Sequence, residues 1–174
     1  MASTLLFSGK FLSILQGDGG WEYAERVRVA GAALIAAVTP EQNVILVEQY
    51  RIPVGARTLE LPAGIIGDEP GESDESHAAA ARRELLEETG YEAEEMEEVV
   101  SGPSSSGLTS ERITLFRARN LKRVGEGGGI ENENITVHEV PLSNVHTWLV
   151  AKAKTGVLID PKVYAGLYFL SQPQ

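Results

Sequence analysis

Cysteine is absent from this chain of 174 residues. Disulfide bonds, zinc sites built on cysteine and thiol nucleophiles are therefore excluded, and the absence suits a reducing compartment. No apolar run reaches the roughly 20 residues that a membrane-spanning helix needs. The first residues also lack the basic segment followed by an apolar one that is typical of a secretory signal. We expect a cytoplasmic protein with no membrane partner.

Positive charge is scarce, because 15 Lys and Arg stand against 25 Asp and Glu and the net charge is −10. Nucleic-acid-binding proteins concentrate basic side chains on the surface that meets phosphate. The acidic balance therefore argues against a nucleic-acid partner. It would also repel a polyanionic small molecule unless metal ions lay between the two.

Residues 75–91, with the sequence ESHAAAARRELLEETGY, predict a short amphipathic helix with a defined start and end. Ser76 can accept a hydrogen bond from the first-turn amides, and the alanines and leucines that follow favour a helix. Gly90 supplies the left-handed residue that ends many helices. Ala81 and Leu85 share one side, which we expect to pack against the core.

Three carboxylates, those of Glu84, Glu87 and Glu88, crowd the last two turns of this helix. Like charges at this spacing cost about 0.2–0.5 kcal/mol per pair. The negative end of the helix dipole disfavours each anion by about 0.3–1 kcal/mol more. A divalent cation such as Mg²⁺ would reverse these terms, because it binds carboxylate oxygens. By charge alone, a solvated acidic face continuing through the glutamates at 92, 94, 95, 97 and 98 is the more frequent explanation.

The order of residues in this stretch resembles the signature of the Nudix hydrolases. Nine residues match in type and spacing across the stretch, among them Glu75, Arg83, Glu84, Leu85, Glu87, Glu88, Gly90 and the apolar Tyr91. The resemblance implies hydrolysis of a nucleoside diphosphate linked to another group. It also implies Mg²⁺ or Mn²⁺ held by the carboxylates of the helix.

One position departs from the family pattern, which has a glycine six residues before the first glutamate, where this chain has Glu69. Gly64, in the segment LPAG, is the natural counterpart. Residues 67–74 then form a lengthened loop rich in turn-forming residues. Glu72 competes with Glu75 for the place of the first glutamate, and this choice stays open.

Alternation and turn signals predict strands on both sides of the helix, and helical spacing predicts two later helices. The strands are expected at 4–16 with a break at 8–9, and at 21–29, 30–38, 44–49, 58–61, from 99 onward, 112–118 and 135–140; the helices are expected at 142–154 and 161–170. This order indicates a layered α+β fold. The resemblance implies the same, as an α/β/α sandwich with a mixed central sheet and the Nudix-box helix. No repeat or linker divides the chain, so residues 1–174 are expected to form one domain.

Several further segments resemble the ADP-ribose pyrophosphatase branch of the family; they are EQYR at 48–51, LELPAG at 59–64, GLTSE at 107–111 and ENENI at 131–135. This resemblance implies a metal site made of the Ala63 carbonyl, Glu84, Glu88 and Glu133. Glu87 would be shared with this metal site or support it, and the resemblance implies that Glu131 is the general base. Which of Glu131 and Glu133 is the base stays open. The glycines at 127–129 suit a mobile loop that brings this base in when substrate binds.

The remaining roles concern positioning and substrate binding. Arg83 is expected to clamp a carboxylate, either Glu75 or Glu87, through its bidentate guanidinium. Arg51 and Glu60 are expected to lie against the phosphates and ribose of the substrate. Trp21 could stack on a base, although a strand aromatic belongs more often to a core or an interface.

These inferences lead to a metal-dependent hydrolase that cleaves the pyrophosphate of ADP-ribose or a related nucleoside diphosphate sugar into a nucleoside monophosphate and a sugar phosphate. Ser106 stands where the ADP-ribose branch usually has proline, which opens the way to other such sugars. Two alternatives remain: the same chemistry on a dinucleoside polyphosphate, dinucleotide cofactor or oxidised nucleoside triphosphate, and a non-catalytic nucleotide-binding module. The resemblance further implies a homodimer, in which strands within residues 1–30 pack on the partner.

Overall fold

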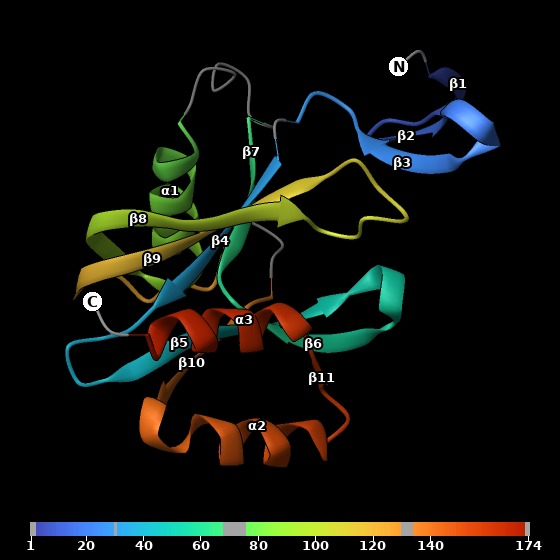
Figure 1. Cartoon of the computed structure of the whole chain (residues 1–174). Helices are drawn as coiled ribbons and strands as arrows, with labels where there is room; N and C mark the ends of the chain where they lie inside the picture. Colours follow the sequence, from blue (N-terminus) through green and yellow to red (C-terminus); the bar gives the residue numbers. More distant parts are fainter. Residues whose placement is uncertain (1–2, 30, 68–75, 130–133, 173–174) are drawn as a thin grey trace.

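The computed structural model describes residues 3–29, 31–67, 76–129 and 134–172. Within these ranges the chain forms two four-stranded sheets, a smaller N-terminal sheet and three α-helices (Figure 1). None of the helices described is both long enough and apolar enough to traverse a lipid bilayer.

The first four-stranded sheet has the order β7-β4-β9-β8. Its strands are β4 (Gly31–Ala37), β7 (Ala63–Ile66), β8 (Tyr91–Pro103) and β9 (Arg112–Arg123). β4 runs parallel to β9 and antiparallel to β7, so the sheet is mixed. β4 is an apolar strand buried on both faces, as expected for a strand flanked on each side.

The second four-stranded sheet has the order β10-β5-β6-β11. Its strands are β5 (Asn43–Arg51), β6 (Ala56–Glu60), β10 (Thr136–Pro141) and the two-residue β11 (Leu158–Ile159). β11 pairs with β6 in parallel and the other pairs are antiparallel. A bridge between Val38 and Val44 links this sheet to the first one.

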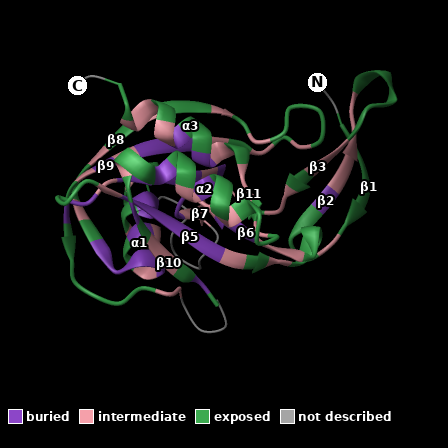
Figure 2. Cartoon of the chain, turned by 90° about the horizontal axis from the view of Figure 1, so that it is seen from below, coloured by how far each residue is buried: buried purple, intermediate pink, exposed green. Residues whose placement is uncertain are grey.

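Three helices cover the two faces of these sheets: α1 (His77–Thr89), α2 (Val145–Ala153) and α3 (Pro161–Leu170). Alternate residues of β4 divide between two cores. Ala33 and Ile35 pack with residues of α1, whereas Leu34 and Ala36 share a core with residues of α2 and α3. Figure 2 shows the buried residues gathered in the strands and on the inner faces of the helices. The predicted α+β class and the α/β/α sandwich are confirmed.

The N-terminal sheet has the order β1-β2-β3 and projects from the rest of the molecule (Figure 1). Its strands are β1 (Thr4–Ser8), β2 (Leu12–Gln16) and β3 (Glu22–Arg26). The predicted break at Ser8-Gly9 is present as the turn between β1 and β2. β3 joins the body through two backbone hydrogen bonds, between Ala24 and the residues Leu108 and Ser110. Every residue of β1 is exposed.

The strand predicted from residue 99 begins earlier, and two short strands were not predicted. β8 begins at Tyr91, directly after α1, and not at residue 99. The glutamates that the charge pattern assigned to a solvated helix face lie on this strand, at the edge of the first sheet. Charged side chains on an exposed edge discourage pairing with other chains. β7 and β11 were missed because strands of four and two residues carry too little alternation to be recognised.

Candidate active site

A pocket of about 330 Å³ lies where the end of α1, the start of α3 and the strands β4 to β7 meet. It gathers eight of the residues that the sequence analysis selected, namely Arg51, Glu60, Ala63, Gly64, Arg83, Glu84, Glu87 and Glu88. These residues are far apart in the sequence and come from four different elements. The pocket therefore brings together residues that the sequence analysis selected from separate segments.

α1 presents its carboxylates to this pocket, and its two caps determine where it starts and ends. The side chain of Ser76 accepts a hydrogen bond from the Ala79 N–H at 3.2 Å, which confirms the predicted N-cap. Gly90 has a φ of 74°, and its N–H donates to the Leu86 carbonyl at 2.8 Å. Glu88 is only 4% exposed. A carboxylate so deeply buried needs partners inside the protein.

β7 lies against these carboxylates and provides one partner. The N–H of Ala63 donates to Oε2 of Glu88 at 2.9 Å. At Gly64, a Cβ atom would lie 1.8 Å from Cδ of Glu84, so no larger residue fits without moving that side chain. Glycine at this position lets the backbone of β7 approach the carboxylate of Glu84 directly. This geometry supports Gly64 as the counterpart of the family glycine.

Arg83 forms ion pairs with two carboxylates of its own helix. Its Nη1 lies 2.8 Å from Oε1 of Glu84 and 3.5 Å from Oε2 of Glu87. Arg83 therefore contacts Glu87, one of its two expected partners, and Glu84 is a second and nearer partner. Both contacts come from the same nitrogen, so they do not show the bidentate geometry that was expected. Glu75, the other expected partner, lies outside the described residues, as does Glu72. The guanidinium partly offsets the repulsion among the three carboxylates.

The donor set of this pocket suits a hard divalent cation. Carboxylate and carbonyl oxygens are the ligands that Mg²⁺ and Mn²⁺ prefer over the softer ligands of zinc. Among the described residues, no three His, Cys, Asp or Glu side chains converge on one point. The described chain thus offers two carboxylates, from Glu84 and Glu88, beside the backbone of Ala63. The predicted further ligand, Glu133, and the predicted base, Glu131, lie outside the described residues.

The glycine-rich segment before residue 130 is anchored to the end of α1. The N–H groups of Gly128 and Gly129 donate to the carbonyls of Glu88 and Glu87 at 2.8 and 3.0 Å. A Cβ at Gly127 would lie 2.4 Å from the carbonyl carbon of Thr89. The sequence analysis expected glycines 127–129 to belong to a mobile loop, and the structure adds that two of them bind the end of α1. They allow a close backbone approach that satisfies carbonyls at the helix end.

Arg51 and Glu60 form a bidentate ion pair on the opposite side of the pocket. The Nε–Oε1 and Nη2–Oε2 distances are 2.8 and 2.7 Å, and Thr58 also donates to Glu60. Burial raises the pKa of Glu60, but these bonds and the charges of Arg51 and Lys162 outweigh it, so its pKa lies below the ordinary value. Glu60 is therefore ionised at neutral pH. It holds the Arg51 guanidinium in one orientation beside the pocket.

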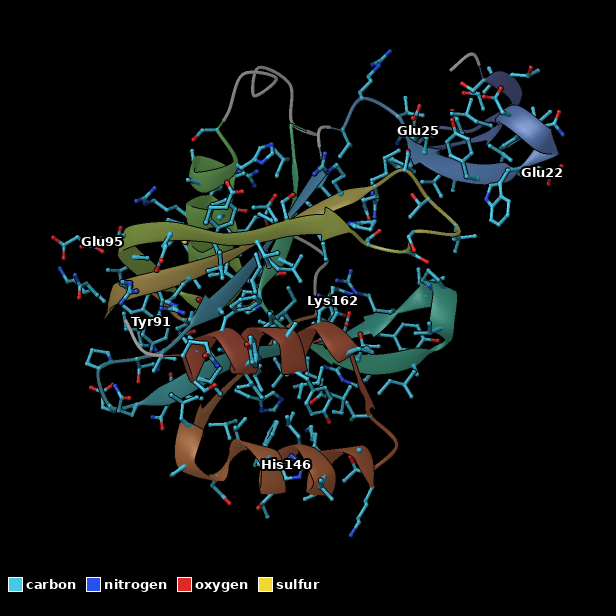
Figure 3. The ribbon with its side chains drawn as sticks, in the orientation of Figure 1. Glu22, Glu25, Tyr91, Glu95, His146 and Lys162 are labelled. Carbon is cyan, nitrogen blue, oxygen red and sulfur yellow. The ribbon has the colours of Figure 1, made fainter. Side chains whose placement is uncertain are left out.

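The structure adds residues that the sequence analysis did not select. Asp160 caps α3 by accepting from the Lys162 N–H at 2.8 Å, and the Lys162 ammonium pairs with the same carboxylate. This cap places Lys162 at the pocket (Figure 3). Asp160 followed by Pro161 is a recognisable helix start, but nothing in the sequence connects it to the helix carboxylates.

An ion pair between Arg26 and Glu111 closes the side of the pocket nearest the N-terminal sheet. Burial raises the pKa of Glu111, but the bonds from Arg26 and Ser104 and the charge of Lys162 bring it below the ordinary value. Glu111 is the last residue of the segment GLTSE. The resemblance of this segment to the ADP-ribose pyrophosphatase branch was the one signal in the sequence that pointed to Glu111. Trp21 does not line the pocket of its own chain. It lies beside β3 and is 63% exposed.

Comparison with known proteins identifies the family. A NUDIX domain model matches residues 28–160. The chain belongs to the Nudix family. This Nudix chain is 34% identical over 171 residues to a methanol dehydrogenase activator from Bacillus methanolicus, with 95% of this chain and 88% of that protein covered.

Two further relatives carry the names of pyrophosphatases. An ADP-ribose pyrophosphatase from Bacillus subtilis (strain 168) is 34% identical over 170 residues, with 92% and 89% of the two chains covered. A GDP-mannose pyrophosphatase from Cronobacter sakazakii is 32% identical over 140 residues, with 76% and 68% covered. These relatives confirm the Nudix family and the branch that the sequence predicted.

A solved structure described as an ADP compounds hydrolase superposes on this chain with a TM-score of 0.66. The alignment covers 98% of this chain and 92% of that one, at 21% identity. At this level of identity the likeness concerns the fold. It confirms the Nudix-type sandwich.

Proposed function

We propose that this Nudix chain hydrolyses the pyrophosphate bond of ADP-ribose or a related nucleoside diphosphate sugar, giving a nucleoside monophosphate and a sugar phosphate. The observation that carries the proposal is one pocket that is lined both by the carboxylates of Glu84 and Glu88 and by the cations Arg51 and Lys162. A pyrophosphate needs both kinds of group, because its own charge repels the attacking water. The names of the pyrophosphatase relatives support the same substrate class.

Glu84 and Glu88, with the Ala63 carbonyl and Glu133, would hold the divalent cation, Mg²⁺ or Mn²⁺. The cation would neutralise phosphate charge and lower the pKa of a bound water. The protein holds the carboxylates of Glu84 and Glu88 in place before a cation binds. The Ala63 N–H binds Glu88, and Arg83 binds Glu84. Glycine at position 64 leaves the space that the Glu84 carboxylate occupies. This fixed arrangement reduces the reorganisation that binding would otherwise require.

We assign the role of general base, which removes the proton of the attacking water, to Glu131, with Glu87 in support. Glu87 lines the pocket and remains partly exposed, so it can exchange protons with solvent.

We assign the binding of the substrate phosphates to the positively charged side chains of the pocket. Arg51, held by Glu60, presents a planar guanidinium that suits a phosphate oxygen pair, and Lys162 adds a point charge from α3. Gly90 and Arg83 act by positioning α1 and its carboxylates. Glu60, with its remaining acceptor capacity, would also suit a ribose hydroxyl.

We assign a homodimer to this chain, built through residues 1–30. The apolar side chains of β1, β2 and the turns beside them are exposed, and they are Leu5, Leu6, Phe7, Phe11, Leu12 and Trp21. A patch of this kind on one small sheet indicates a protein interface. Trp21, which is remote from the pocket of its own chain, could then stack on a base bound by the partner.

A substrate panel tests the proposal. Purified protein would be incubated with ADP-ribose, GDP-mannose, a dinucleoside polyphosphate and a dinucleotide cofactor, each with Mg²⁺, with Mn²⁺ or with a chelator. Release of a nucleoside monophosphate from a nucleoside diphosphate sugar, lost with chelator, is expected. Faster cleavage of a dinucleotide would move the assignment to that class. Nucleotide binding with no hydrolysis of any compound would show that the enzyme assignment is wrong.

A further inference from the structure

A second pocket, of about 360 Å³, lies at the far end of the elements that form the active-site pocket. α3 contributes Lys162 to the active-site pocket at its start and Leu170 to the second pocket at its end. β9 likewise contributes Ile113 to the first and Arg117 to the second. The ten residues of α3 separate the two pockets by about 15 Å. The second pocket is therefore not a part of the substrate site.

Arg117 is the central charged group of this pocket, and its side chain is only 12% exposed. One Nη group donates to the Phe169 carbonyl near the end of α3, and Nη1 lies 3.8 Å from Glu97. Its Nε–H is buried and has no hydrogen-bond partner among the described residues. Because this N–H is buried, a ligand in the pocket cannot reach it directly. What Arg117 offers the pocket is the positive charge of its guanidinium.

Arg119 lies two residues further along β9, so its side chain leaves the strand on the same face as that of Arg117. Its Nη2 pairs with Glu97 at 2.8 Å, but Glu97 is half exposed and can turn away into solvent. The other walls of the pocket mix polar side chains with apolar ones, and the apolar ones include Leu121, Leu142 and Leu170. The pocket thus combines two guanidinium groups with three leucines.

We propose that this pocket binds a small organic anion, a carboxylate or a phosphate monoester, with its charged end on Arg117 and Arg119 and its apolar body against the leucines. The anion would be attracted by the charge of Arg117 and would replace Glu97 as the partner of Arg119. A guanidinium favours such oxyanions because its N–H groups match the spacing of two oxygens. The pocket volume suits a compact ligand. The proposal does not rest on the hydrolytic function.

The test is an NMR titration of ¹⁵N-labelled full-length protein with three probes: benzoate, phenyl phosphate and acetate. Benzoate and phenyl phosphate share an apolar ring and differ in the charged group, whereas acetate has the charge without the ring. We expect saturable shifts of the Gln42, Arg119 and Leu142 amides with at least one ring compound. The Kd should be about 1 mM, as for other small ligands. Whichever of benzoate and phenyl phosphate binds more tightly identifies the charged group that the pocket prefers. Acetate should bind at least about tenfold more weakly than that compound.

The diagnostic variant is Arg119→Gln, because Arg117 also binds the end of α3 and its removal could unfold the helix. Arg119→Gln should weaken ring-compound binding at least about tenfold. Arg123→Gln is the matched control: it lies on the same strand, makes the same charge change and is outside the pocket. It should bind like the unmodified protein. The proposal is wrong if neither ring compound gives saturable shifts at these amides, if Arg119→Gln binds unchanged, or if acetate binds as tightly as the tighter of the two ring compounds.

Discussion

At the scale of single residues, Gly64 shows how one missing side chain shapes the candidate active site. Gly64→Ala would introduce a Cβ 1.8 Å from Cδ of Glu84, so that carboxylate must move. We expect activity to fall at least about tenfold and stability by about 1–3 kcal/mol. Steady-state kinetics and urea denaturation would measure both. Gly102→Ala, where a Cβ meets nothing within 4 Å, is the control and should change neither.

Glu88 combines deep burial with negative charge. Glu88→Gln keeps an oxygen to accept from the Ala63 N–H but removes the charge that a divalent ion needs. We expect turnover to fall by about 100-fold or more. In metal-free buffer the melting temperature should rise by about 2–4 °C, because a like-charge repulsion at the negative end of α1 is lost. Glu92→Gln, on exposed β8, is the control. Unchanged turnover in Glu88→Gln would contradict its assignment as a ligand.

Lys162 is the residue that the fold adds to the site. Lys162→Met should raise KM about tenfold and leave kcat within about threefold, since a charged hydrogen bond to phosphate is lost in ground and transition states alike. Initial-rate kinetics on the best substrate of the panel would measure this. Lys154→Met, at the exposed end of α2, should change neither constant. A fall in kcat without a change in KM would mean that Lys162 acts only in the transition state.

At the scale of elements, Glu48 ties β5 to its neighbours. It is 6% exposed and lies within 2.9 Å of Arg57, His138 and Lys152, which reach it from β6, β10 and α2. Burial raises its pKa, but the bonds from Lys152, Arg57 and His138 lower it from 4.5 to about 2. The carboxylate is therefore favoured in the folded state. Its stabilisation is present above pH 4.5 and is lost as the pH falls toward 2.

This linkage predicts the behaviour of Glu48→Gln. At pH 7 the variant should be less stable by about 2–4 kcal/mol, because Arg57 and Lys152 lose their counter-charge. The stability difference from the unmodified protein should shrink as the pH falls from 5 toward 2.5. Urea denaturation at several pH values would measure it. Glu95→Gln, on the exposed edge strand, should show little difference at any pH, and a pH-independent loss in Glu48→Gln would contradict the linkage.

At the scale of the whole molecule, the N-terminal sheet determines the assembly that we propose. Replacing Phe7 and Phe11, which are 62% and 68% exposed, with Asp should turn dimers into monomers and lower activity if the partner contributes to the site. Sedimentation velocity over a range of concentrations would measure the change. Tyr168→Asp, at a residue 59% exposed on α3, is the matched control and should leave the assembly intact. A monomeric unmodified protein would contradict the dimer.

The sequence by itself determined the features that depend on local spacing. The span of α1, its caps at Ser76 and Gly90 and the set of carboxylates on its last turns follow from neighbours three and four residues apart. α3 was likewise predicted to begin at Pro161 and end at Leu170, as it does. The family signature lies almost wholly within α1, which is why the family could be recognised from the sequence.

Contacts between elements that are distant in the sequence could be seen only in the folded structure. Lys162 joins the candidate active site because α3 packs against β4, β6 and β9. The Arg26–Glu111 pair joins it because β3 is hydrogen-bonded to Leu108 and Ser110, next to Glu111. No periodicity encodes this packing. The acidic run after Gly90 became an edge strand because β9 was available to pair with it. Strand pairing joins residues distant in sequence, so its energy is absent from any local pattern.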